Sequence, residues 1–240
     1  MNRSKILEFF DAEQIKEQIH VVGVGVIGSN VVEQLVRMGV KTLDVWDFDT
    51  VSAHNIANQM FIEPMLGMNK CEAIAWYTNN INPECKVNMH TEGLKEPYIL
   101  NGYVFLCVDS IDLRREIVEA NKYNLHCLGI MDFRMRLTDA QMYFASNDWQ
   151  YEEMLKTMQF THEEAAEATP TSACGVTLSV CYAPKTIVSF GVSNFVHFIK
   201  QVDYANLITI DMDTFETQSF KWKERKKKET LGILDMLIKQ

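Results

Sequence analysis

The sequence predicts an α/β fold of the doubly wound, Rossmann-like type, with a mostly parallel sheet and a C-terminal antiparallel extension. Three observations predict it. A glycine-rich turn follows an apolar, β-branched segment that begins at Ile19, and strand and helix patterns then alternate as far as residue 145. Two short strand patterns stand close together near the end, with Met212 and Asp213 between them. Alternation indicates parallel strands joined by crossover helices, whereas two strands joined by a short turn pair antiparallel.

The glycine-rich turn has the pattern G-x-G-x-x-G, formed by Gly23, Gly25 and Gly28. The first glycine permits a tight turn out of the strand, the second lets the backbone approach a phosphate, and the third allows close packing of helix on strand. The helix predicted at 29–38 would present its N-terminal N–H groups to that phosphate. It would end at Gly39, a typical C-cap residue.

An acidic residue follows the next strand. The strand predicted at 42–46 ends at Asp47, about 20 residues beyond the glycines, where a carboxylate accepts hydrogen bonds from ribose hydroxyls. Asp109 stands in the same way at the carboxyl end of the buried strand predicted at 103–108. Ligands of doubly wound sheets bind outside those carboxyl ends. The sequence therefore predicts a nucleotide site.

The remaining elements are predicted from periodicity and from breakers such as Pro64, Gly67 and Pro83. Asn69 is expected to cap the first helix after the crossover, and Ser110 to open the next. The predicted helices are 3–18, 70–79, 110–124 and 185–201, and the predicted strands are 87–91, 103–108, 126–130, 140–145, 207–211 and 214–220.

The chain is expected to form one domain with appended segments. Residues 1–18 form an N-terminal helical segment, and 19–145 form the nucleotide-binding Rossmann-like domain. Residues 146–240 supply a crossover loop, a buried helix and C-terminal strands that complete the same domain. The stretch 146–172 is rich in acidic residues, and we expect it to be a lightly packed crossover.

Composition excludes several classes of protein. The net charge of −9 weighs against nonspecific nucleic-acid binding, which depends on Lys and Arg. No apolar run approaches the roughly 18 residues of a membrane span, so no membrane partner is expected. Six cysteines are scattered without a C-x-x-C pair, so no structural zinc is expected. A reducing cytoplasm suits such cysteines best.

Three segments together resemble a known family: VVGVGVIGSN, then DVWDFDTVSAHNIANQ with LGMNKCEA, and finally CVDSIDLRRE. They resemble the ubiquitin-activating-enzyme-like superfamily, and within it the ThiF/MoeB/HesA family of ATP-dependent adenylyltransferases. The resemblance is close from Ile19 to about residue 122 and thinner to about residue 200. It implies binding of ATP and Mg²⁺, attack on the α-phosphate by a carboxylate, and release of pyrophosphate. The carboxylate would be the C-terminal glycine of a small ubiquitin-like or sulfur-carrier protein.

The resemblance also implies roles for five residues. Asp47 matches the carboxylate that holds the ATP ribose, and Asn55 matches an asparagine that faces the triphosphate. Lys70 matches the phosphate-binding lysine. Asp109 matches the carboxylate associated with magnesium and the reacting phosphate. Arg114 matches an arginine that follows that aspartate, although an ordinary charge on a surface helix is its rival interpretation.

The chain departs from the family pattern at three places. Asn58 stands where the family has an arginine on the triphosphate, and an amide replaces neither the charge nor the fork of a guanidinium. The four zinc cysteines of many members are missing. Cys174 and Cys181 are the candidates for an acceptor cysteine, with a buried structural role as the favoured alternative for each.

Arg3 is a candidate to compensate for Asn58. Family members have an N-terminal arginine that reaches the ATP of the partner protomer in a homodimer, and Arg3 would fill that role here. The alternative is a frayed terminal charge.

Three functions from different classes stay open. The leading one is an adenylyltransferase, with a tRNA threonylcarbamoyladenosine dehydratase as a rival within that class. The second is a noncatalytic nucleotide-binding partner subunit, which Asn58 supports. The third is an NAD-dependent oxidoreductase, in which Asn55, Lys70 and Asp109 would have no natural role.

Overall fold

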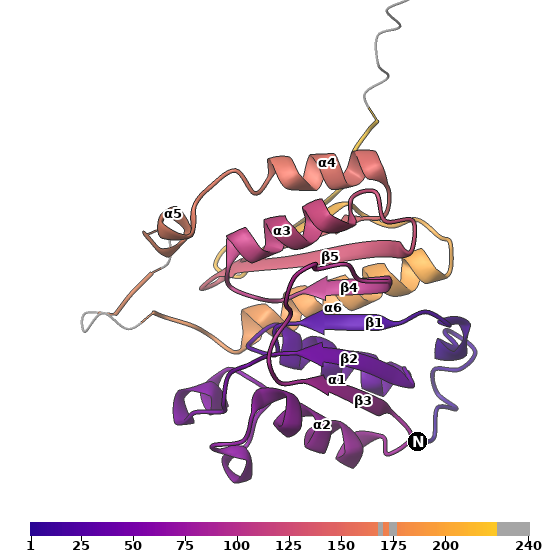
Figure 1. Cartoon of the computed structure of the whole chain (residues 1–240), viewed down its shortest axis with the longest axis vertical. Helices are drawn as coiled ribbons and strands as arrows, with labels where there is room; N and C mark the ends of the chain where they lie inside the picture. The colour runs from indigo at the N-terminus through magenta and orange to yellow at the C-terminus, as the bar shows by residue number, and fades with distance from the viewer. Residues whose placement is uncertain (168–169, 173–176, 225–240) are drawn as a thin grey trace, which may run out of the picture.

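One mixed sheet of eight strands organises the computed structural model, which describes residues 1–167, 170–172 and 177–224. The strands are β1 Ile19–Val22, β2 Thr42–Trp46, β3 Lys86–His90, β4 Gly102–Leu106, β5 Cys127–Arg136, β6 Asp139–Ala145, β7 Leu207–Asp211 and β8 Glu216–Phe220. Their order in the sheet is β3-β2-β1-β4-β5-β6-β7-β8 (Figure 1). β1 to β5 pair in parallel, and β5 to β8 pair antiparallel. The predicted fold class is confirmed.

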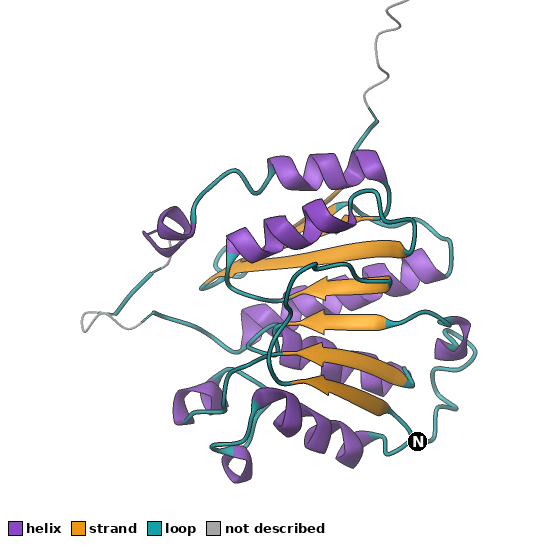
Figure 2. Cartoon of the chain, viewed as in Figure 1, coloured by secondary structure: helices purple, strands orange, loops and turns teal. Residues whose placement is uncertain are grey.

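Helices cover the sheet from both sides (Figure 2). α1 Gly28–Met38, α2 Lys70–Ile81 and α6 Tyr182–Ile199 pack on one face, and α3 Ile111–Asn121 and α4 Asp148–Lys156 on the other. Short elements complete the described chain: the 3₁₀ helices Ala12–Gln14, Ala53–Ala57 and Glu63–Met65, and α5 His162–Glu167. Each face has its own apolar core, so the central strands, such as β1 and β4, are buried between two layers.

The predicted helix ends are confirmed where a local signal set them. Gly39 ends α1 in the left-handed conformation at φ 96°. The side chain of Asn69 accepts a hydrogen bond from the Cys71 N–H at 2.8 Å and so caps α2. Ser110 caps α3 through the Leu113 N–H. These ends depend on residues within one turn, which is why the sequence predicted them.

The predicted N-terminal helix over 3–18 is wrong. Residues 4–9 form turns, and only Ala12–Gln14 is a 3₁₀ helix. Asp11 begins that short helix by accepting a hydrogen bond from the Glu13 N–H at 3.1 Å, which separates it from the preceding turns. The apolar positions of the predicted amphipathic helix were Ile6, Leu7, Phe9, Phe10 and Ile15, and of these only Phe10 is buried. Few of these residues pack on the domain, so little stabilises a continuous helix here.

The expected lightly packed crossover at 146–172 is also corrected over its first part. Residues 148–156 form α4, which buries Tyr151, Met154 and Leu155 against the face of the sheet that α3 covers. Asn147 caps the helix by accepting from the Gln150 N–H at 3.2 Å. The prediction relied on the acidic residues of this segment and overlooked that its apolar residues recur at helical spacing.

The connection from β3 to β4 is a loop, residues 91–101, that crosses the α3 side of the sheet (Figure 1). Beneath it, polar side chains replace the apolar face that a helix would cover. His90 Nε2 lies 2.9 Å from Asp44 Oδ1, and Trp46 stacks on His90 with ring centroids 3.6 Å apart. This end of the sheet therefore stays accessible on one side.

Candidate nucleotide site

The glycine turn lies against the end of β4, because β1 and β4 are neighbours although a long stretch of chain separates them. A Cβ added to Gly23 would lie 2.8 Å from the Val108 backbone N, and one added to Gly28 would lie 1.8 Å from the Gly23 carbonyl oxygen. Both glycines are thus required for packing. A Cβ at Gly25 would meet nothing within 4 Å, so this backbone faces open space that a ligand can occupy. The tight turn predicted at Gly23 and the close packing predicted at Gly28 agree with this geometry, and the approach of a phosphate to Gly25 stays a prediction.

Asp47 ties the end of β2 to the glycine turn. Its Oδ2 accepts a hydrogen bond from the Val24 N–H at 2.7 Å, and its Oδ1 accepts one from the Asp49 N–H at 2.9 Å. Burial raises the pKa of the Asp47 carboxyl above its ordinary value, although the nearby Lys70 ammonium opposes that shift. Each oxygen keeps a further lone pair, so the carboxylate can still accept from a ribose hydroxyl.

Lys70 begins α2 with its side chain turned toward Asp49. The lysine is 7% exposed, and its Nζ lies 2.8 Å from Asp49 Oδ2. The ammonium carries three donors, so two stay available for phosphate oxygens after one is given to Asp49. Asp49 is a site residue that sequence reasoning missed. Its signal was the second acidic residue of the D-x-D that Asp47 opens.

The loop that follows Asp49 brings residues 55–59, which have the pattern N-x-x-N-Q, to the start of α1. The Met60 N–H donates to Ser29 Oγ at 3.2 Å. Asn55 is 5% exposed, and its Oδ1 accepts from the backbone N–H and the hydroxyl of Ser52, so its oxygen caps the 3₁₀ helix.

Two amide oxygens in this loop lack a partner. Asn58 Oδ1 and Gln59 Oε1 are buried and have no hydrogen bond within the part of the chain that the structure describes. A buried polar atom without a partner is costly, so both amides retain bonding capacity that a ligand can use. Gln59 ends the segment DVWDFDTVSAHNIANQ that carries the family resemblance, but it was not itself predicted as a site residue.

Asp109 is exposed just beyond β4, between Val108, which borders Gly23, and the cap of α3. Its carboxylate makes no ion pair among the residues described. One free carboxylate beside a triphosphate is the arrangement that holds Mg²⁺ in many nucleotide enzymes, since the phosphates and water supply the other oxygens. The residues present therefore fit magnesium. No cluster of three His, Cys, Asp or Glu side chains forms a metal site in the described part of the chain.

Arg114 was predicted to be either a cofactor-binding arginine or an ordinary charge on the surface of a helix, and the structure shows that it is not on the surface. The side chain is buried, donates to the carbonyl oxygens of Leu106 and Val108, and forms an ion pair with Asp132. Burial works to raise the pKa of Asp132, but the guanidinium groups of Arg114 and Arg134 outweigh it and hold that pKa below its usual value. The guanidinium of Arg114 thus secures the end of β4, and its charge is paired with Asp132 inside the protein.

Arg3 lies far from its own chain's site. It forms ion pairs with Asp11 and Glu13 at 3.3 and 3.0 Å, and its side chain packs on Gly39 at the C-terminal end of α1. The glycine turn is at the other end of that helix, and Figure 1 places the N-terminus by the amino ends of the strands. Arg3 therefore cannot reach this chain's own nucleotide from where it lies.

Of the two candidates for an acceptor cysteine, the structure describes one. Cys181 is exposed at the N-cap of α6. Cys174 lies outside the described residues.

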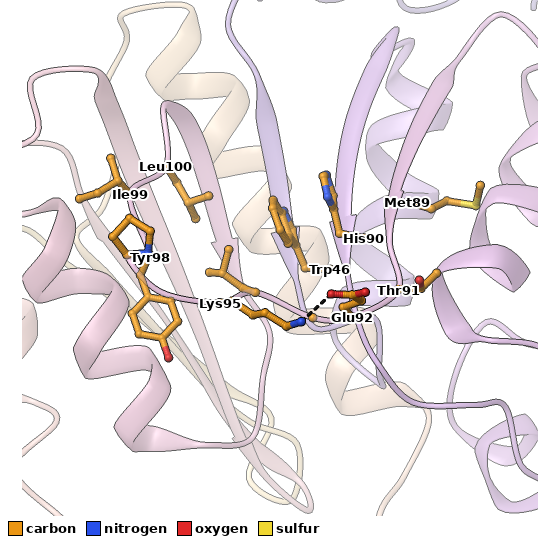
Figure 3. A pocket seen from close by; sticks show the side chains of 12 residues that line it. Trp46, Met89, His90, Thr91, Glu92, Lys95, Tyr98, Ile99 and Leu100 are labelled. Carbon is orange, nitrogen blue, oxygen red and sulfur yellow. Dashed lines mark hydrogen bonds and ion pairs between the residues drawn. The ribbon is translucent and has the colours of Figure 1, made fainter.

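A pocket of about 410 Å³ lies at the carboxyl ends of β2 and β3, beneath the loop 91–101 (Figure 3). The stacked rings of Trp46 and His90 form one wall, and Leu100 lies opposite. The ion pair of Glu92 with Lys95 crosses the rim. Trp46 directly precedes Asp47 in the sequence, although Asp47 itself does not line the pocket.

Comparison with protein families finds that the model of the ThiF family matches residues 7–231. The chain is 30% identical over 135 residues to ubiquitin-like modifier-activating enzyme 5 of Drosophila willistoni, covering 48% of this chain and 33% of that protein. It is 30% identical over 121 residues to the tRNA threonylcarbamoyladenosine dehydratase of Haemophilus influenzae, covering 46% of each. The chain thus spans less than half the length of these two relatives.

Among solved structures, the crystal structure of E. coli MccB with ATP aligns with a TM-score of 0.63. The two chains are 16% identical, and the alignment covers 88% of this chain and 65% of the other. At that identity the likeness shows the fold alone. Separately, no helix among the described residues is long and apolar enough to cross a membrane.

Proposed function

The chain belongs to the ThiF family, and from this premise we propose that it is an ATP-dependent adenylyltransferase that activates a carboxylate and releases pyrophosphate. The observation that carries this proposal is the convergence of four features at the carboxyl ends of the parallel strands. The open backbone at Gly25 lies beside the carboxylate of Asp47, the buried ammonium of Lys70 and the free carboxylate of Asp109.

These groups suit nucleotidyl transfer. Asp47 holds the ribose, the pocket beside Trp46 offers a planar aromatic surface to the base, and the N-terminus of α1 faces the phosphates. Lys70 contributes positive charge to the triphosphate, and Asp109 would hold a Mg²⁺ that would add to this electrostatic stabilisation. The attacking carboxylate is ionised at neutral pH, so the step requires no general base.

The substrate carboxylate that we propose is the C-terminal glycine of a small ubiquitin-like or sulfur-carrier protein. The fly relative, a ubiquitin-like modifier-activating enzyme, supports this choice. The name of the Haemophilus relative supports the rival within the class, a tRNA dehydratase, against which the net charge of −9 weighs. Cys181 is the candidate acceptor that the structure leaves exposed.

A noncatalytic nucleotide-binding subunit is the second candidate, and Asn58 is the observation that favours it. The buried Oδ1 of this residue has no partner in the described part of the chain, and the side chain carries no charge for the triphosphate. An NAD-dependent oxidoreductase is the weakest candidate, because the Lys70–Asp49 pair and Asp109 have no task in hydride transfer.

ATP–pyrophosphate exchange with a panel of carrier proteins ending in glycine tests the proposal. Exchange that requires both Mg²⁺ and one carrier is the expected result. ATP binding without exchange for any carrier would favour the noncatalytic subunit. In a parallel thermal-shift assay, ATP with Mg²⁺ at about 100 times its dissociation constant should add about 2.7 kcal/mol of stability. Stabilisation by NAD and none by ATP with Mg²⁺ would contradict the nucleotide assignment.

A further inference from the structure

Asp49 is joined to Lys70 by its backbone and by its side chain. The Lys70 N–H donates to the Asp49 carbonyl oxygen at 2.9 Å, and the Lys70 ammonium lies 2.8 Å from Asp49 Oδ2. The next pair of residues, Thr50 and Asn69, forms an isolated antiparallel bridge. The two segments are thereby held opposite each other, so the lysine side chain has little freedom to leave the carboxylate.

The same aspartate is joined to the glycine turn through Asp47. The Asp49 N–H donates to Asp47 Oδ1, and the Val24 N–H donates to Asp47 Oδ2. The Asn69 side chain adds a hydrogen bond to the Asp47 carbonyl oxygen at 3.3 Å. One continuous chain of hydrogen bonds therefore connects the backbone that faces the phosphates, the ribose acceptor and the ammonium.

Burial explains why the lysine requires this partner. The side chain of Lys70 is 9% exposed, whereas that of Asp49 is 53% exposed. An ammonium removed from water is costly unless a counter-charge lies next to it. Asp49 supplies that counter-charge from the solvent side and leaves two donors of the ammonium unspent.

Resting on the proposed function, we propose that Asp49 is a positioning residue that holds the Lys70 ammonium aligned for the triphosphate. Asp49 itself touches the lysine and not the nucleotide. Its effect on binding therefore depends on the phosphates of the ligand and on the presence of Lys70.

The experiment measures dissociation constants by calorimetry for ATP with Mg²⁺, and by competition for adenosine, which has no phosphate. The proteins are the full chain, Asp49→Asn, Asp49→Glu, Lys70→Met and the double variant Asp49→Asn/Lys70→Met. Glu72→Gln is the matched control, because it removes one negative charge from an exposed position in the first turn of the same helix.

Asp49→Asn is expected to weaken ATP binding by about 30-fold, on the scale of losing one partner of a buried charge pair. Adenosine binding should change by no more than about threefold, and Asp49→Glu should recover most of the loss. In the double variant, Asp49→Asn should add little to the effect of Lys70→Met, because the two residues act as one unit. Glu72→Gln should bind ATP like the wild type.

Four results would overturn the positioning role while leaving the proposed function intact: unchanged ATP binding by Asp49→Asn, tighter ATP binding, equal losses for ATP and adenosine, or additive effects in the double variant. Tighter binding would mean that Asp49 competes with the phosphates for the lysine. Wild-type protein that does not bind ATP with Mg²⁺ would overturn both proposals.

Discussion

Two networks of charged side chains lie at the carboxyl ends of the parallel strands, and they differ in whether their bonding capacity is spent. In the nucleotide network, Asp47, Asp49 and Lys70 are linked to one another but keep unused donors and acceptors beside the open backbone at Gly25. The arginine cluster, formed by Arg114, Asp132 and Arg134, is centred on a fully buried carboxylate that is paired at both oxygens. A charge at a strand end is thus a site only where it has bonds left to offer.

The charges of the arginine cluster pair with one another. Asp132 is fully buried between the two guanidinium groups. Arg134 also donates to the carbonyl oxygen and hydroxyl of Thr157 and lies over the ring of Tyr143 at 4.4 Å. The cluster joins the end of β4, strand β5 and the end of α4, so its function is to hold these elements together.

Asp132→Ala should produce the largest effect that separates the two networks. Removing the shared carboxylate leaves two buried guanidinium groups without compensation, which should cost about 3–5 kcal/mol of folding free energy. A melting temperature lower by about 10 °C follows for a chain of this size. Urea and thermal unfolding measure the change. A variant as stable as the wild type would mean that the cluster does not hold the fold together.

Asp109→Asn should have the opposite effect, with little change in stability and a large loss of activity. This side chain is exposed and makes no ion pair among the described residues, so the melting temperature should stay within about 2 °C of the wild type. ATP–pyrophosphate exchange should fall by at least about 100-fold, the scale of losing one electrostatic group in a site. Glu119→Gln, at an exposed position of α3 that makes no ion pair among the described residues, is the matched control. Unchanged exchange in Asp109→Asn would remove this carboxylate from the mechanism.

Arg3→Ala tests whether a second copy of the chain completes the nucleotide network. Arg3 cannot reach its own site, so any effect on catalysis must act across a homodimer. We expect exchange to fall by about 10- to 100-fold, since charge-assisted bonds to a triphosphate would be lost. Adding Asn58→Arg should recover part of that loss by returning a guanidinium to the same chain.

Sedimentation of the wild-type protein is the companion measurement for the trans arginine. A dimer at assay concentration is the expected result. Full exchange activity from a monomer would exclude a trans role for Arg3, and its ion pairs with Asp11 and Glu13 would then be its whole function.

The smallest expected effect is a pH dependence that Asp47 gives to the nucleotide network. Burial raises the pKa of this carboxyl, so protonation begins at a higher pH than for an ordinary Asp near 3.9. ATP affinity should decline by a few fold as pH falls through the raised pKa, because the ribose acceptor loses its charge. Calorimetry at several pH values should show a flatter profile for Asp47→Asn.

The stability contribution of Asp47 has the opposite sign. With a folded pKa above the unfolded one, its contribution is fully present below the unfolded pKa and is lost as pH rises through the folded pKa. Affinity and stability should therefore move in opposite directions over the same pH range. Parallel movement of the two would contradict a buried, ionised Asp47.

Most of the fold could be predicted from the sequence because its signals are local. The strands at 42–46 and 207–211 were predicted with the bounds that the structure has, and Gly39 and Asn69 marked helix ends through contacts within one turn. The glycine turn and Asp47 followed from a pattern that spans one strand–helix–strand unit. Such patterns depend on φ, on capping and on periodicity, none of which requires knowledge of distant partners.

The tertiary structure alone decided which charges pair. Arg114 and Asp109 stand close together in the sequence, yet the first pairs with Asp132, 18 residues away on β5, and the second makes no ion pair among the described residues. Lys70 met Asp49 only because the segments around Thr50 and Asn69 bridge. An ion pair depends on the distance and burial of two side chains from separate elements, and no periodicity in the sequence records either quantity.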